Sequence, residues 1–112
     1  MEKTQIYTNG HARAVAETYA TLAGKAYGSA LRAVILFGSV SRGEYEYGKS
    51  DIDVALILDK VGAEPEVCKR YRNSFDTHIF PFEVSTRRWF NEKNSDHILR
   101  EINENGEVLY AA

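Results

Sequence analysis

Two short apolar runs with a polar stretch between them constrain this fold more than any other feature of the sequence. The runs cover residues 33–37 and 54–58, and apolar runs of this length between turn-rich segments indicate buried strands. The stretch between them reads GSVSRGEYEYGKSDID and ends on Asp51 and Asp53. Because side chains two residues apart on a strand point the same way, both carboxylates should face one point. The other face is then left for Ile52, Val54, Leu56 and Leu58.

A pair of carboxylates on one face of a strand needs a neutralising cation. Like charges held close together raise each other's pKa, and Mg²⁺ prefers hard oxygen ligands of this kind. Gly38 and Ser39 follow the first apolar run. A residue without a Cβ, a hydroxyl and free backbone amides together allow a phosphate to approach closely. The sequence therefore predicts a cleft in which Asp51 and Asp53 hold a metal ion and Gly38 and Ser39 hold a phosphate.

Three short segments together resemble the signature of the minimal nucleotidyltransferases, small relatives of the DNA polymerase beta superfamily. They are Gly38-Ser39, Arg42-Gly43 and Ser50-Asp51-Ile52-Asp53. The ending ILREINENGEVLY also resembles the carboxyl-terminal helix and tail of that family. The resemblance implies an α/β (α+β) fold with a small mixed sheet of three or more strands flanked by helices.

The resemblance also implies roles for individual residues. Asp51 and Asp53 would bind Mg²⁺, while Gly38, Ser39 and Arg42 would hold the triphosphate of ATP or another nucleoside triphosphate. In the family a third carboxylate comes from the strand beside the paired acids. Asp76 is the nearest candidate for that catalytic and metal-binding position. The alternative is His78, which aligns there when Pro81 is matched to the end of the family pattern.

For function, the resemblance implies transfer of a nucleoside monophosphate, AMP from ATP, to a protein acceptor. Minimal nucleotidyltransferases accompany HEPN-domain ribonuclease toxins, and some neutralise them by modifying a tyrosine of the toxin. This predicts an antitoxin enzyme with a HEPN partner. Two alternatives stay open: a non-catalytic antitoxin that acts by binding alone, and nucleotidyl transfer to a small molecule such as an aminoglycoside.

Composition sets the broad class. The 112 residues, 44% of them hydrophobic, are expected to form one domain over residues 1–112. A formal net charge of −2 disfavours sequence-independent nucleic-acid binding, which draws on a basic surface. The sequence has no apolar run of membrane-helix length and no signal-peptide pattern, so a cytoplasmic location is expected. Cys68 is the single cysteine and is predicted to be buried.

The remaining pattern predicts alternating helices and strands. Apolar spacing predicts a helix over residues 12–26, capped by Thr8 or Asn9 and ended by Gly28, and then a strand over residues 31–37. Further predicted elements are a helix after Pro65 with Val67, Cys68 and Tyr71 inside, a strand over residues 75–84, a helix with Trp89 and Phe90 in the core, and a helix with Ile98, Leu99 and Ile102 that ends at Gly106.

The polar stretch between the first two predicted strands contains two tyrosines, Tyr45 and Tyr47. Aromatic side chains beside a cleft either stack on a bound base or cover an edge of the core. The sequence favours the second interpretation and leaves the first open.

Overall fold

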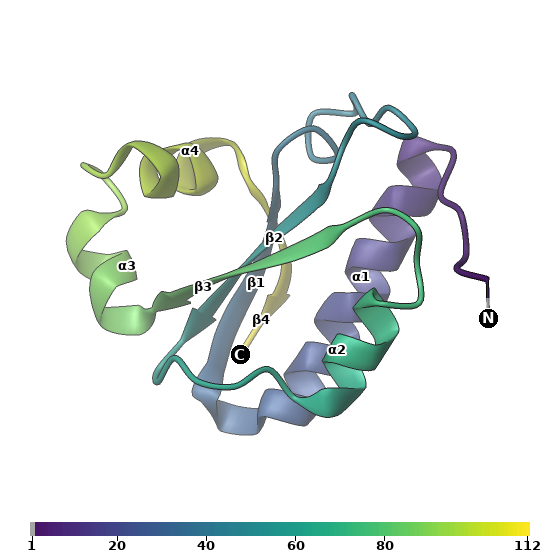
Figure 1. Ribbon diagram of the computed structural model, residues 1–112. Coiled ribbons are helices and arrows are strands. Elements are labelled where there is room, and N and C mark those ends of the chain that lie inside the picture. Colours follow the sequence, from purple (N-terminus) through teal and green to yellow (C-terminus); the bar gives the residue numbers. More distant parts are fainter. Residues whose placement is uncertain (1) are drawn as a thin grey trace.

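The computed structural model describes residues 2–112 and consists of a four-stranded sheet with helices on both faces (Figure 1). The strand order is β3-β2-β1-β4. Strand β1 pairs antiparallel with β2 and β4, whereas β2 and β3 are parallel. The predicted mixed sheet flanked by helices is therefore confirmed.

The elements follow the predicted order closely. In sequence they are α1 (Asn9–Tyr27), η1 (Gly28–Ala30), β1 (Leu31–Phe37), β2 (Ile52–Leu58), α2 (Glu66–Arg72), β3 (Ile79–Ser85), α3 (Thr86–Glu92), α4 (His97–Asn105) and β4 (Glu107–Ala111). No helix among residues 2–112 is long and apolar enough to cross a membrane.

Capping side chains define the starts of the two longest helices. The Thr8 hydroxyl accepts a hydrogen bond from the His11 amide at the start of α1, and the Asp96 carboxylate accepts from the Ile98 and Leu99 amides at the start of α4. Gly28 ends α1 with a positive φ of 66°, a conformation that glycine adopts without steric cost. These signals were all present in the sequence.

The sheet divides the hydrophobic core into two clusters. Helices α1 and α2 cover one face, and the side chains of Ile52, Val54, Leu56 and Leu58 point into that cluster. Helices α3 and α4 cover the other face, where Ala55 and Ile57 pack with Trp89 and Leu99. In Figure 1 the two helical layers lie on either side of the sheet. The alternation along β2 is therefore confirmed, and Asp53 belongs to the face of α3 and α4.

Some boundary and burial predictions were wrong. The third strand begins at Ile79 rather than residue 75, because residues 74–76 bond to the N-terminal segment instead. The Thr4 amide donates to the Ser74 carbonyl at 2.9 Å, and the Asp76 amide donates to the Thr4 carbonyl at 2.8 Å. Three apolar side chains expected in the core are exposed: Val67, Phe90 and Ile98.

A polar cluster lies between α1 and α2. The Arg72 Nε donates to both Glu64 carboxylate oxygens, at 2.8 and 3.0 Å, and the Tyr19 hydroxyl donates to the same carboxylate at 2.5 Å. Burial and the neighbouring Glu64 raise the pKa of Tyr19, and burial raises the pKa of Cys68 to about 11. Cys68 is fully buried, as predicted.

Candidate active site

The two aspartates lie where β2 begins. Strand pairing puts Asp53 directly between Phe37 of β1 and Phe80 of β3. Asp51 precedes the strand, beside His78, whose carbonyl accepts the Ile52 amide at 2.9 Å. The Nδ1 of His78 lies 3.9 Å from Oδ2 of Asp51, and both side chains are more than half exposed. The sheet therefore presents both acids at one open end.

Gly38 brings the backbone of β1 against the Asp53 carboxylate. Its φ is 77°, and a Cβ at this position would lie 2.4 Å from Oδ2 of Asp53. Because real Cβ atoms essentially never approach another atom to within 3.0 Å, only glycine fits this corner without displacing the acid. The glycine predicted to admit a phosphate thus lies in direct proximity to one of the paired acids.

The backbone after Gly38 has the features of an anion site. No hydrogen bond within residues 2–112 uses the amides of Ser39 or Val40. Ser39 is half-buried and follows a residue of positive φ, so its N–H group can reach phosphate oxygens, whereas Val40 is fully buried. Arg42 follows in the same turn, with its amide bonded to the Gly38 carbonyl at 3.3 Å and its guanidinium paired with Glu44 at 2.8 Å.

The pKa of Asp53 reflects partial burial and the neighbouring Asp51 charge. Burial raises the pKa of this carboxyl and the neighbouring Asp51 charge raises it further, while His78 and Arg42 lower it by a smaller amount. An acid that is half-buried beside a second acid is stabilised in its ionised form by a cation. Two carboxylates in this arrangement, open to a further anionic ligand, fit the oxygen-rich coordination of Mg²⁺, which is typically completed by substrate phosphates.

The candidates for the third position lie on the other side of Asp51. Asp76 and His78 line a hollow of about 300 Å³ together with Asp51 and Tyr47. Among residues 2–112, no group of three or more His, Cys, Asp and Glu side chains is arranged to hold a metal ion. The structure therefore brings Asp76 to the hollow of Asp51 but does not join it to Asp51 and Asp53 in a three-ligand cluster.

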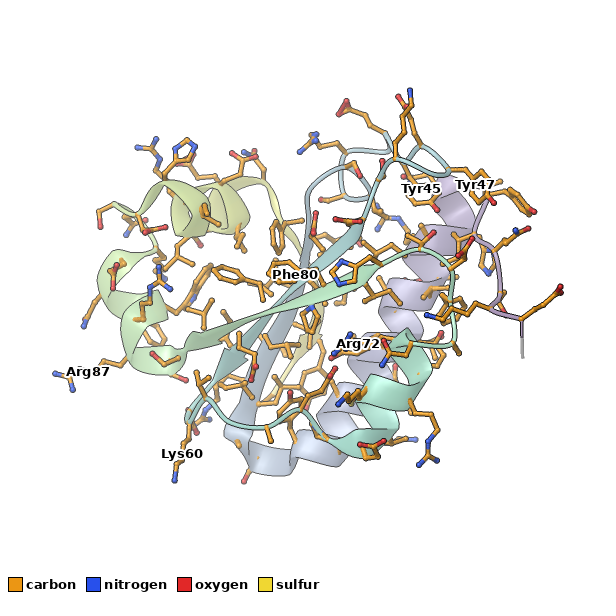
Figure 2. The ribbon with its side chains drawn as sticks, viewed as in Figure 1. Tyr45, Tyr47, Lys60, Arg72, Phe80 and Arg87 are labelled. Carbon is orange, nitrogen blue, oxygen red and sulfur yellow. The ribbon has the colours of Figure 1, made fainter. Side chains whose placement is uncertain are left out.

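An apolar hollow beside Asp53 was not predicted from the sequence. It has a volume of about 250 Å³ and is lined by Asp53, Ile98 and three phenylalanines, Phe37, Phe80 and Phe82. The rings of Phe80 and Phe82 stack with centroids 6.1 Å apart, and Phe80 remains 42% exposed. Figure 2 labels Phe80 on β3. Alternation predicts which residues of one strand share a face, but it does not identify the residue that pairs with them on the next strand. The sequence alone therefore did not bring these rings next to Asp53.

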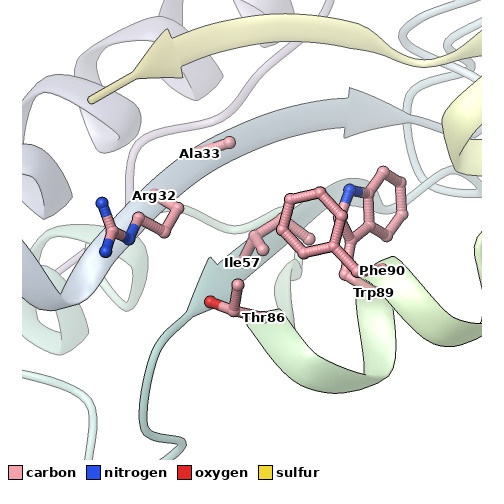
Figure 3. A pocket seen from close by; sticks show the side chains of 6 residues that line it. All are labelled: Arg32, Ala33, Ile57, Thr86, Trp89 and Phe90. Atoms are coloured by element: carbon pink, nitrogen blue, oxygen red, sulfur yellow. The ribbon is translucent and has the colours of Figure 1, made fainter.

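A second apolar cavity lies far from the acids. It measures about 370 Å³ and is lined by residues at the start of β1, the end of β2 and helix α3 (Figure 3): Arg32, Ala33, Ile57, Thr86, Trp89 and Phe90. The acids lie at the opposite end of the β1–β2 pair. This cavity therefore has no part in the site formed by Asp51 and Asp53.

Comparison with known proteins agrees with this geometry. Residues 24–112 match the family model described as Polymerase beta, Nucleotidyltransferase. A search of curated proteins finds no match. The matched segment contains all four strands, the glycine corner and both aspartates. The chain therefore belongs to the polymerase beta nucleotidyltransferase family.

Proposed function

We propose that this nucleotidyltransferase moves AMP from ATP to a tyrosine of a HEPN-domain ribonuclease toxin in the cytoplasm and thereby acts as an antitoxin. The observation that carries the enzymatic part is the closeness of the glycine corner to the acid pair. A Cβ on Gly38 would fall 2.4 Å from the Asp53 carboxylate. One triphosphate can therefore reach both the free Ser39 amide and a cation on Asp51 and Asp53.

Each residue of the corner then has a specific task. Asp51 and Asp53 would hold Mg²⁺, which when bound neutralises charge on the transferring phosphate and the pyrophosphate leaving group. The Ser39 amide and hydroxyl orient the β and γ phosphates, and Arg42 adds a positive charge beside them. Positioning and electrostatics account for catalysis in phosphoryl transfer, because the protein supplies little covalent chemistry.

The apolar hollow beside Asp53 supports an aromatic acceptor. Phe37, Asp53 and Phe80 form one row across three strands, so the carboxylate lies between two apolar rings. The hollow of about 250 Å³ is larger than the roughly 150 Å³ cavity that accommodates a benzene ring. A phenol ring that packs on Phe80 places its hydroxyl toward the acid pair. A sugar has no aromatic face to pack on these phenylalanine rings.

The test is transfer of labelled AMP to a purified HEPN partner in the presence of Mg²⁺. We expect the label on a tyrosine of the partner, and a loss of at least about a hundredfold in rate for Asp53→Asn because an electrostatic ligand is removed. Asp59→Asn is the matched control. Asp59 directly follows β2, but its carboxylate binds Arg32 and Thr86 at the end of the strand away from the site. An unlabelled partner that still binds the protein would eliminate the transferase proposal.

One observation favours a second candidate, an antitoxin that acts by contact alone. Within residues 2–112, no third carboxylate joins Asp51 and Asp53 in a metal cluster. Under this alternative, neutralisation of the toxin survives the double change Asp51→Asn and Asp53→Asn, provided that circular dichroism shows an unchanged fold. Loss of neutralisation in the folded double variant, with partner binding retained, favours the enzyme.

A further inference from the structure

Two exposed tyrosines lie together beside the open end of the sheet. Tyr7 is 59% exposed and Tyr47 is 44% exposed, and their ring centroids are 4.6 Å apart with the planes inclined by 46°. Tyr47 lines the hollow that contains Asp51, whereas Tyr7 lies outside its lining. Tyr7 therefore packs on Tyr47 without itself lining the hollow.

The loop that carries Tyr47 is held on both sides. Before it, the buried Tyr45 hydroxyl bonds to the Ile6 carbonyl at 2.6 Å and to Thr77 Oγ1 at 2.7 Å. After it, the Ser50 hydroxyl accepts the Glu46 amide at 2.9 Å, and the Ser50 amide returns a bond to the Glu46 carbonyl. Figure 2 shows Tyr45 and Tyr47 next to the start of α1. The backbone on both sides of Tyr47 is thus anchored, while the Tyr47 ring itself remains exposed.

The position of Tyr47 relative to the acids gives the ring a use. Gly38 and Ser39 follow β1, the acids lie at the start of β2, and His78 precedes β3. These groups therefore lie in this order across neighbouring strands at one end of the sheet. Tyr47 shares a hollow with Asp51 and His78, on the side of the acids away from Gly38. A nucleotide whose outer phosphates lie at Ser39 and whose α-phosphate lies at the acids extends its nucleoside toward Tyr47.

We infer that Tyr47, supported by Tyr7, is the platform on which the base of the nucleoside triphosphate stacks. This inference rests on the proposed nucleotidyl transfer and adds the base-binding half of the nucleotide site. The hollow of about 300 Å³ is at the lower end of the size range of small-molecule pockets. Stacking on an aromatic face is tolerant of base identity, because every base has a π surface.

The test compares two ligands that share phosphates and differ in the base. Binding of ATP and of inorganic tripolyphosphate is measured by calorimetry with Mg²⁺ for the wild type, Tyr47→Ala and Tyr47→Phe. We expect Tyr47→Ala to weaken ATP binding by about fivefold to 150-fold, the range for loss of one base–aromatic stack. Tripolyphosphate should bind equally to all three proteins, and Tyr47→Phe should bind ATP like the wild type.

Two further variants distinguish a base platform from a protein interface and from a general loss of phosphate binding. Phe90→Ala removes a 66% exposed ring from α3 and should leave the binding of both ligands unchanged, whereas Tyr7→Ala should weaken ATP binding in the same direction as Tyr47→Ala. Equal weakening of both ligands by Tyr47→Ala, or no weakening of either, overturns the inference. So does a loss confined to partner binding, which would assign the tyrosines to a protein interface.

The wild type separates failure of this inference from failure of the proposed function. If wild type binds tripolyphosphate but binds ATP no more tightly, only the platform fails. If it binds neither ligand, the proposed function fails as well.

Discussion

Replacement of Gly38 by alanine tests the central geometry of the site. The new Cβ would lie 2.4 Å from Oδ2 of Asp53, and ordinary van der Waals contact begins at 3.4 Å. The carboxylate must therefore move by about 1 Å, the difference between these distances. A misplacement of about 1 Å can cost about a hundredfold in rate. We expect Gly38→Ala to lose about two orders of magnitude in nucleotidyl transfer.

The same substitution also has a cost that is unrelated to the acid. Gly38 has a φ of 77°, and a left-handed conformation costs an alanine roughly 1–2 kcal/mol. For a chain of this size, such a loss lowers the melting temperature by several degrees. A fall in activity alone could therefore reflect partial unfolding, so stability must be measured in parallel by urea unfolding.

Gly28→Ala is the matched control. Gly28 has a φ of 66°, and a Cβ there would have no atom within 4 Å. It lies before β1, whereas Gly38 follows β1, so it is separated from the acids by the length of the strand. We expect a loss of stability of about 1–3 kcal/mol, because its φ of 66° with a ψ of −142° is a combination that glycine adopts far more readily than alanine, and full activity at a temperature where both variants are folded. Equal transfer rates for folded Gly38→Ala and Gly28→Ala would refute the close-approach argument.

Three further predictions concern the rest of the molecule. Arg72→Ala leaves the Glu64 carboxylate, whose side chain is only 11% exposed, without its cation. We expect the free energy of unfolding in urea to fall by roughly 2–3 kcal/mol, which is below the range for fully buried pairs. The control is Arg88→Ala, which removes an exposed pair and should cost about 0–1 kcal/mol. For Asp96, hydrogen bonds from the Leu99 and Ile98 amides and the nearby Arg88 lower the pKa below the ordinary 3.8. Its ionised form therefore stabilises the fold above that pH, and the gap in melting temperature between wild type and Asp96→Ala should shrink as the pH falls below 3.8; a constant gap would contradict this. Phe80→Ala should raise KM for the protein acceptor while leaving ATP affinity and, within about 1 kcal/mol, stability unchanged; an unchanged KM would remove Phe80 from the acceptor site.

The parts of the fold that could be predicted are those specified by local signals. The helix from Asn9 to Tyr27 has regular apolar spacing, a Thr8 cap and a terminal glycine, and both central strands are apolar runs. The alternation around Asp53 correctly separated the two faces of β2. These features need no knowledge of distant partners, because each is decided within a few residues of chain.

The errors arose where distant segments meet. Residues 75–78 have a strand-like pattern, but Phe75 forms its bridge with Thr4, some seventy positions earlier in the chain, so β3 starts late. Ile98 lies on the apolar side of α4, yet it stays exposed because it borders the hollow at Phe80 rather than a closed core. The sequence identified Asp76 and His78 as candidates for the third position. It did not predict the distance of either from Asp51 and Asp53, because that distance depends on how the segments before β2 and β3 meet.

The antiparallel pairing of Phe37 with Asp53 has a consequence for engineering. The corner and the acids are kept together by the ladder between β1 and β2, and the peptide that joins them over residues 40–50 does not set their separation. Since closure entropy grows only logarithmically with the number of residues in a connection, a change of length in this peptide should leave Gly38 against Asp53, but it would displace Arg42 and Tyr47, which the peptide itself carries. This connection is therefore a suitable place to redesign the contacts to the nucleotide while the glycine and the acids stay together.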